Sequence, residues 1–278
     1  MRASELLAVA RLDLGEVLRS RWLLFCLAVY GLLGAVFVGI GVRESSVIEF
    51  TGTGRVLFSL CHALVLLLPL LALLATGQVV NRARDDGSLE LFFSHPIGRS
   101  SYLVGVTAIR FAALALPLAA VMLGLAVLGR LAFGEAVPWA FLARTLAICT
   151  ALLAAFVGLG LATSVWVRQP ARAMTALLLL WAGAVALLDV AGIALLLRWR
   201  LPAQGVFLLA AANPVQAARL GLLSSAEPTL AALGPVGFYL ANRVGAAGLL
   251  ALGIAWPALV GAGSWLLAWA AFRRGDAV

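Results

Sequence analysis

Residues 82–100, RARDDGSLELFFSHPIGRS, decide how this chain is divided. Charged residues, two glycines and a proline surround a short apolar segment here. A long run without any charge precedes the stretch, and a mostly apolar run, interrupted at Arg110, follows it. Such a composition is typical of a connection at the water-exposed end of membrane-spanning helices, because charged side chains are costly inside a bilayer. The stretch therefore predicts a polar loop between two spans.

The whole chain has the composition of an integral membrane protein. Of its 278 residues, 64% are hydrophobic and 12% are charged, and the mean hydropathy is +1.08. A spanning helix needs about 20 mostly apolar residues, and charged residues divide the chain into six runs of about that length. We expect an all-α membrane domain over residues 22–278, with six transmembrane helices at 22–41, 57–80, 102–128, 140–166, 173–197 and 245–272.

The arginines indicate the orientation. An even number of spans places both termini on one side, and more arginines flank the helices on that side than on the other. Because the positive excess is usually cytoplasmic, we expect both termini and the loop 82–100 in the cytoplasm.

The first apolar run has full spanning length and no small-residue cleavage site after it, so we expect it to remain as the first span. The net charge of +8 is spread over helix ends, which does not indicate a nucleic-acid-binding protein.

Residues 1–21 form an amphipathic segment before the first span. On a helical wheel the apolar and charged side chains separate onto opposite sides. The apolar side holds Ala3, Leu7, Ala10, Leu14, Val17 and Leu18, and the charged side holds Arg2, Glu5, Asp13, Glu16 and Arg19. We expect this helix to lie along the cytoplasmic membrane surface with its charged side away from the lipid. The alternative is a simple extension of the first span.

A short amphipathic helix is expected within the loop, over residues 85–96. Asp86 is the better N-cap candidate beside the turn at Gly87, and Pro96 disfavours helix at His95. The apolar residues that recur at helical spacing are Leu89, Phe92 and Phe93. Two covers for these side chains stay open: the bilayer or helix ends of the same chain, or a groove on another protein. In the second case Arg82, Arg84, Asp85, Asp86 and Glu90 would form a polar rim.

Small residues recur every four positions in two of the spans. The first set is Thr150, Ala154, Gly158 and Ala162, and the second is Ala247, Ala251 and Ala255. Small side chains let two helix backbones approach closely in a membrane. We therefore expect helix packing along both sets.

Several kinds of site are not indicated by the sequence. The chain has no lysine, so it has no Walker A motif and any ATP hydrolysis must occur in another chain. Ser264 in GAGSWLL has no histidine on a nearby span to activate it, because the two histidines are His62 and His95. Cys61 beside His62 is a weak metal signal. We predict no catalytic, cofactor or metal site.

Asp189 is the one acidic residue inside the fifth apolar run. Ionisable groups within a membrane are costly and often functional. A structural polar contact and a role in a substrate path or gate both remain open for it.

The N-terminal helix, the six runs and the loop DDGSLELFFSHPIGRS, residues 85–100, resemble the type-2 permeases of ABC transporters. In that family this loop forms the coupling helix, which contacts a separate ATPase subunit. The loop together with NPVQAARL, residues 213–220, is similar more narrowly to the NosY permeases. Those permeases belong to NosDFY complexes, which mature the copper centres of nitrous oxide reductase.

The resemblance implies a homodimeric, non-catalytic permease in the bacterial inner membrane with no cofactor of its own. The implied partners are two copies of a NosF-like ATPase carrying ATP and Mg²⁺, a NosD-like periplasmic protein and a copper chaperone lipoprotein. The implied ATPase-coupling residues are Asp85, Asp86, Gly87, Leu89, Glu90, Phe92, Phe93, His95 and Pro96. The outer segment 198–243 would meet the periplasmic protein through Asn213, Pro214, Arg219 and Leu220.

A membrane anchor without transport is one alternative, in which disrupting the surface at 89–93 would leave assembly and maturation intact. Two other functions also compete with this interpretation. The first is an ABC-2 permease that exports a drug, a lipid or an ion. The second is a secondary transporter in which Asp189 binds a proton or coupling ion. Replacing Asp189 with asparagine would abolish transport in the secondary transporter, whereas an ABC permease would depend on its ATPase.

Overall fold

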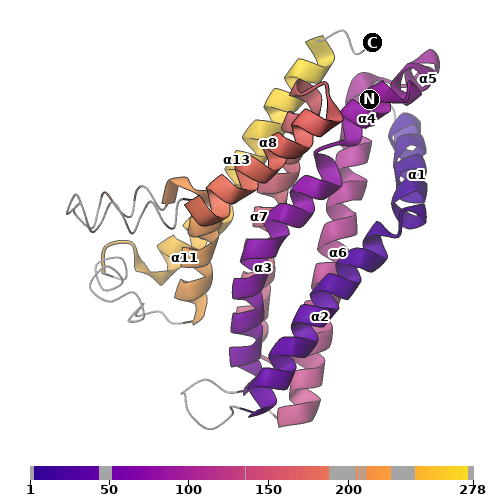
Figure 1. The fold of residues 1–278 in the computed structure, drawn as a ribbon. Coiled ribbons are helices and arrows are strands. Elements are labelled where there is room, and N and C mark those ends of the chain that lie inside the picture. Colours follow the sequence, from indigo (N-terminus) through magenta and orange to yellow (C-terminus); the bar gives the residue numbers. More distant parts are fainter. Residues whose placement is uncertain are drawn as a thin grey trace.

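The computed structural model describes residues 3–43, 52–134, 136–187, 205, 208, 211–226 and 242–274. Every regular element within these residues is a helix, which confirms the all-α class. The elements are α1 (Ala3–Arg19), α2 (Trp22–Arg43), α3 (Gly52–Thr76), α4 (Val79–Asp85), α5 (Ser88–Ser94), α6 (Arg99–Phe133), α7 (Trp139–Trp166), α8 (Pro170–Ala182), the π-helical turn η1 (Gly183–Leu187), α11 (Pro214–Ala226) and α13 (Gly245–Arg274). The long helices form an elongated bundle (Figure 1).

Several helices are long and apolar enough to cross a membrane. They are Ala63–Asp85, Arg99–Leu131, Trp139–Trp166 and Gly245–Arg274, and α1 with α2 makes a fifth if this pair, bent by 58°, is one span. The chain is therefore a multi-spanning membrane protein, as expected. The predicted span 173–197 is described only as far as residue 187, at the end of η1. The number of six spans stays a prediction.

The predicted helix 57–80 is replaced by two helices. α3 begins earlier, at Gly52, and after an interruption at Gly77 and Gln78 the chain continues as α4 to Asp85. A Cβ on Gly77 would lie 2.7 Å from the Leu73 carbonyl oxygen and 2.8 Å from a methyl carbon of Leu177 on α8. Glycine therefore allows α8 to pack against the break between α3 and α4.

α7 lies at the centre of the bundle and packs against α13 with the two backbones in contact. A Cβ on Gly261 of α13 would lie 2.5 Å from the Ala154 carbonyl oxygen, and a Cβ on Gly158 would collide with the Gly261 carbonyl. This confirms the close approach predicted for residues 150–162. The second set of small residues, 247–255, does not pack this way: Ala247, Ala251 and Ala255 are exposed on the described chain.

α1 leaves the line of α2 at a left-handed residue, Arg21, with φ of 56°. Leu7, Leu14 and Leu18 are exposed, as an apolar face towards lipid requires. The prediction that the charged side faces away from the protein and the lipid is wrong for Asp13, which is only 6% exposed. Val17 was expected among the lipid-facing residues, but it is fully buried. The reason is that α6 packs against α1 and supplies a cation for the acidic side chains.

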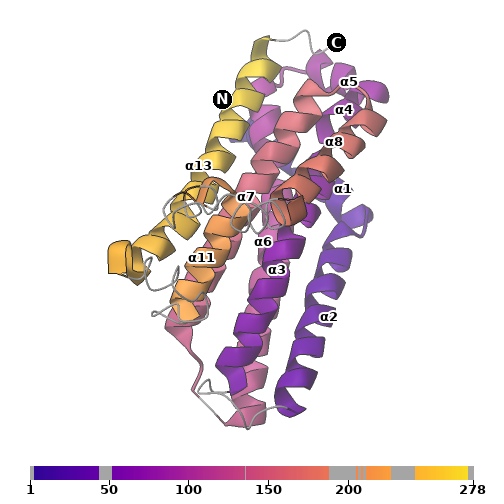
Figure 2. The same cartoon turned by 60° about the vertical axis from the view of Figure 1, so that its left-hand side comes forward.

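The start of α1, the α4–α5 segment and the end of α13 meet at one end of the bundle (Figure 2). Glu5 of α1 accepts hydrogen bonds from the Gly98 amide at 3.3 Å and the Ser101 hydroxyl at 3.0 Å, both at the start of α6. Arg99 donates to the carbonyl oxygen of Arg273 at 3.4 Å. An acidic group is favourable at a helix N-terminus, where backbone amides lack partners.

Candidate functional site: the α4–α5 elbow

The α4–α5 elbow, residues 79–96, contains most of the polar stretch 82–100. Its corner is at position 87. The φ of 73° there lies in the left-handed region, which glycine adopts more readily than other residues. Gly87 occupies the N-cap position of α5, so the N-cap predicted at Asp86 is one residue early. Asp86 still helps to start the helix, because its Oδ1 accepts from the Ser88 amide at 3.0 Å. The hydrogen bonds with Ser88 lower the pKa of the Asp86 carboxyl below its ordinary value.

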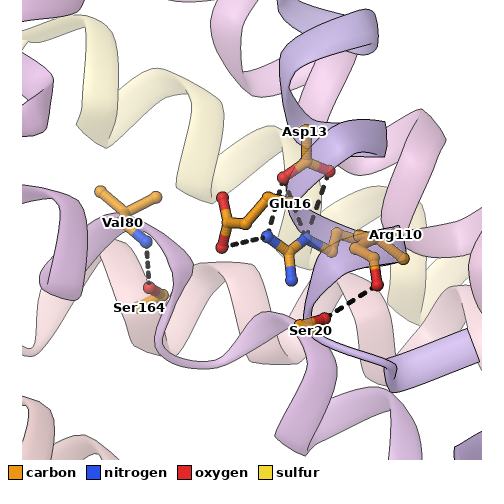
Figure 3. A network of polar contacts seen from close by, with 7 residues as sticks. Asp13, Glu16, Ser20, Val80, Arg110 and Ser164 are labelled. Carbon is orange, nitrogen blue, oxygen red and sulfur yellow. Dashed lines mark hydrogen bonds and ion pairs between the residues drawn. The ribbon is translucent and has the colours of Figure 1, made fainter.

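Hydrogen bonds in both directions fix α4 to the C-terminal end of α7. The Ser164 hydroxyl of α7 accepts from the Val80 amide at 2.8 Å and from the Asn81 amide at 3.3 Å (Figure 3). In return, Arg84 Nη1 donates to the Val165 carbonyl oxygen at 3.0 Å. The unpaired amides at the start of α4 and a carbonyl near the end of α7 thus satisfy each other. This joint holds α4 against α7 in one register.

α5 is fixed to α6 and α13 by an aromatic cluster. The ring centroids of Phe92 and Phe93 lie 5.6 and 6.1 Å from that of Tyr102 on α6. Phe272 of α13 closes the cluster at 6.2 Å from Phe93 and 6.0 Å from Tyr102. Such offset and edge-on ring pairs add stabilisation beyond their buried area.

The structure decides which cover the apolar residues of α5 have within this chain. Leu89 is only 1% exposed, and Phe92 and Phe93 pack against the core. The chain itself therefore covers Leu89, as in the first of the two alternatives. Phe92 and Phe93 are only half-buried, and their contact with another protein stays a prediction. The expectation that Leu89 is free to enter a groove on another protein is wrong, because its side chain is buried in the core of this chain.

The outward face of the elbow is made by other residues. Leu91 is 68% exposed. The remaining exposed residues of this face are Asp85, Asp86, Glu90, Ser94, His95 and Pro96. Sequence reasoning missed Leu91, although a wheel places it about 200° from Leu89 and beside Glu90. The end of α5 is fixed as predicted: His95 has an extended backbone, with ψ of 159°, immediately before Pro96.

A buried ion-pair network joins α1 to α6 next to the elbow (Figure 3). Arg110 donates from Nε and Nη2 to Asp13 Oδ1, at 3.1 and 2.8 Å, and from Nη2 to Glu16 Oε1 at 3.0 Å. The Arg110 and Asp13 side chains are 11% and 6% exposed, whereas that of Glu16 is 71% exposed. A charge this deeply buried needs its partner, so the network fixes how α1 is rotated against α6.

Residues of the predicted outer motif make contacts mainly within this chain. Asn213 is 4% exposed; its Nδ2 donates to the Ala184 carbonyl oxygen of η1 at 2.5 Å, and its Oδ1 accepts from the Val215 amide at 3.0 Å. Pro214 lines a cavity of about 380 Å³ between α7, α8, η1 and α13. Arg219 and Leu220 are half-buried on α11. A contact of these four residues with a periplasmic protein stays a prediction, and Asp189 lies outside the described residues.

No group of three or more His, Cys, Asp or Glu side chains that could hold a metal ion occurs in the described ranges. The side chains of Cys61 and His62 lie outside what the structure describes. Cys26 and Cys149 are buried, separate thiols.

Comparison with known proteins gives the family. The family described as ABC-2 family transporter protein matches residues 7–268, almost the whole chain. The chain belongs to this ABC-2 family.

Two relatives of this ABC-2 permease bear the same description, "Probable ABC transporter permease protein NosY". The protein from Stutzerimonas stutzeri is 30% identical over 280 residues, which cover 96% of this chain and 97% of the relative. The protein from Pseudomonas aeruginosa is 31% identical over 97 residues, or 35% of each chain. The resemblance to NosY-like ABC-2 permeases that the loop and the 213–220 motif predicted is therefore confirmed.

Proposed function

We propose that this ABC-2 permease receives force from a separate ATPase at the α4–α5 elbow and transmits it through the bundle. The working unit is a homodimer of six-span chains in the bacterial inner membrane, with both termini and the elbow in the cytoplasm. The chain itself is non-catalytic and binds no cofactor, whereas ATP and Mg²⁺ bind to the ATPase. The absence of lysine from the sequence supports this division of labour.

The observation that carries the proposal is the attachment of the elbow to three long helices. α4 is bonded to α7 through Ser164 and Arg84, and α5 packs on α6 and α13 through Tyr102 and Phe272. A displacement of the elbow therefore acts on all three helices together. A partner can drive such a change only if it contacts the two states differently, and a firmly held elbow gives it a surface on which to act.

The exposed face of α5 suits a protein partner. Leu91 supplies an apolar centre, and Asp85, Asp86 and Glu90 supply charges around it. An apolar centre with a polar rim is the usual anatomy of a protein interface. In this proposal Leu89, Phe92 and Phe93 hold the helix in place from behind rather than contact the ATPase.

The output that we propose is a conformational change at the periplasmic side, used in copper-centre maturation of nitrous oxide reductase. The support is the similarity over 96% of the chain to a probable NosY. The partners would be two NosF-like ATPase subunits, a NosD-like periplasmic protein and a copper chaperone lipoprotein. The motif around Asn213 would respond to the change, because Asn213 joins α11 to η1.

Co-purification of the permease with the ATPase tests the docking face. In Leu91→Gln we expect about tenfold weaker ATPase binding, or about 1.4 kcal/mol, because an interface loses an apolar anchor. The matched control is Leu131→Gln, since Leu131 is a similarly exposed leucine, 76%, near the other end of α6. Equal ATPase retention by both variants would contradict docking at α5.

The copper content of nitrous oxide reductase tests the proposed output. In a strain without this permease, we expect reductase protein to accumulate without its full copper content. Reductase with normal copper would instead favour the competing export of a drug, lipid or ion. ATPase binding to the elbow is measured separately, so either half of the proposal can fail alone.

A further inference from the structure

A cavity of about 760 Å³ lies behind the elbow, between α1, the α3–α4 segment, α5 and α6. Its volume is within the usual range of small-ligand pockets, about 300–1,000 Å³. Residues on several helices line it, from Val9 and Trp22 to Val79, Val106 and Met174. Asp86 belongs both to the docking face and to this cavity, whereas Leu91 and the Asn213 motif do not line it.

The lining has an apolar part and a charged part. Leu12, Trp22, Leu74 and Val79 belong to the apolar part. In the charged part, Arg110 and Asp13 neutralise each other through their paired hydrogen bonds. Any further charge selectivity must come from the other ionisable residues of the lining.

Three of these residues carry a charge at neutral pH: Arg82, Glu16 and Asp86. Arg82 is exposed and forms no ion pair within the part of the chain that the structure describes. Glu16 uses Oε1 for Arg110, its side chain is 71% exposed, and it extends from α1 on the side that faces α4 (Figure 3). Asp86 is also exposed, with Oδ1 bound to the Ser88 amide. The cavity therefore offers one cation and two carboxylates to a ligand.

The position of the cavity corresponds to the headgroup layer of a membrane. α1 exposes Leu7, Leu14 and Leu18, as a helix lying in the membrane interface does. Trp22, at the start of α2, lines the cavity, and tryptophan is enriched at the boundary between lipid and water. A ligand here would have its polar part among headgroups and its apolar part alongside the spans.

We infer that this cavity binds a phospholipid with a phosphoethanolamine headgroup. Arg82 binds the phosphate, Glu16 and Asp86 bind the primary ammonium, and the acyl chains follow the apolar lining. The headgroup carries one negative and one positive charge, which matches the one cation and two carboxylates better than an anionic headgroup does. Phosphatidylglycerol has no ammonium, so it would bring no cation to Asp86 or to the carboxylate of Glu16, which shares Arg110 with Asp13.

Lipid retention by the full-length permease, purified without the ATPase, tests this inference. The protein is placed in nanodiscs of equal parts phosphatidylethanolamine and phosphatidylglycerol, released into detergent, and examined by native mass spectrometry. We expect one tightly held phosphatidylethanolamine per chain. Arg82→Gln should reduce its retention about tenfold, because a charged hydrogen bond is lost. Val79→Trp, which fills the cavity without changing charge, should also release the lipid.

Two further variants sharpen the result. Asp86→Asn keeps an acceptor for the Ser88 amide and removes only the charge, so it should reduce the preference for phosphatidylethanolamine over phosphatidylglycerol. Arg130→Gln, an exposed arginine in the last turn of α6, should retain lipid like the parent.

Several results would overturn the inference. They are equal retention of both lipids by the parent, or unchanged retention in Arg82→Gln and Val79→Trp. A dimer without retained lipid would also overturn it. In that case a second copy of the chain, rather than a lipid, would cover the cavity. Since no ATPase is present, these outcomes are independent of docking at Leu91.

Discussion

Compared with the α7–α13 contact, which brings the backbones at Gly158 and Gly261 together without a charge, the α1–α6 contact depends on buried Arg110 and its carboxylate partners. Within a membrane, small residues allow close packing where apolar burial gives no advantage over lipid. Near the interface, an ion pair can fix one rotation of a helix that lipid alone would leave free. The two contacts therefore specify geometry by shape and by charge, respectively.

The largest effect is expected from breaking the charged contact. Arg110→Met leaves Asp13 buried without its cation, which should cost about 3–5 kcal/mol. The measurement is the thermal midpoint of the monodisperse protein in detergent. Adding Asp13→Leu should recover much of the loss, because no buried charge then remains. A single variant as stable as the parent would show that charge does not hold α1 on α6.

A smaller effect is expected from the contact specified by shape. Gly261→Ala introduces a Cβ 2.5 Å from the Ala154 carbonyl oxygen, and overpacking of this kind costs about 1–3 kcal/mol. Gly263→Ala is the matched control on the same helix, because nothing lies within 4 Å of its added Cβ. The same thermal midpoint is measured for both. If the two variants behave alike, α7 and α13 do not need their close approach.

Ser164→Ala tests the polar joint between α7 and the elbow. The Val80 and Asn81 amides lose the hydroxyl that accepts from them, and loss of a helix-capping side chain costs about 1 kcal/mol. We expect hydrogen exchange at these two amides to rise while the rest of α7 stays protected. Ser94→Ala is the control, since its exposed hydroxyl bonds only within the end of α5. Unchanged exchange at Val80 would contradict the joint.

The smallest effect should come from Glu16→Gln. Its side chain is 71% exposed, so solvent screens its bond to Arg110, and exposed pairs contribute about 1 kcal/mol or less. In lipid-free detergent the thermal midpoint should hardly change. A loss as large as that of Arg110→Met would mean that Glu16, rather than Asp13, supplies the main counter-charge.

Much of the architecture could be predicted from the sequence, because hydropathy and the backbone preferences of glycine and proline act locally. The membrane class, a short helix in the loop 82–100 and the stop before Pro96 all followed from composition and backbone preference. The close approach at Ala154 and Gly158 followed from the spacing of small residues. These features depend on residues near one another in the chain.

The side that each amphipathic helix buries could not be predicted in the same way. A wheel separates charged from apolar side chains but does not say whether water or Arg110 meets Asp13, because Arg110 is 97 positions away along the chain. Likewise, the spacing of Leu89, Phe92 and Phe93 shows an apolar face, whereas the cover supplied by Phe272 depends on tertiary packing. A wheel places Leu91 opposite Leu89, but which of the two sides stays exposed depends on that same packing.

The left-handed residue Arg21 gives the N-terminal helix a fixed phase relative to the first long helix. Each residue of an α-helix advances by about 100° around its axis. One residue inserted between Asp13 and Arg21 would therefore rotate the part of α1 that precedes it by about 100°. Asp13 would then point away from Arg110, and exposed leucines of that part would turn towards the bundle. Homologous chains that vary in length at this junction would need a compensating shift of their acidic residues, so indels there should be rarer than substitutions.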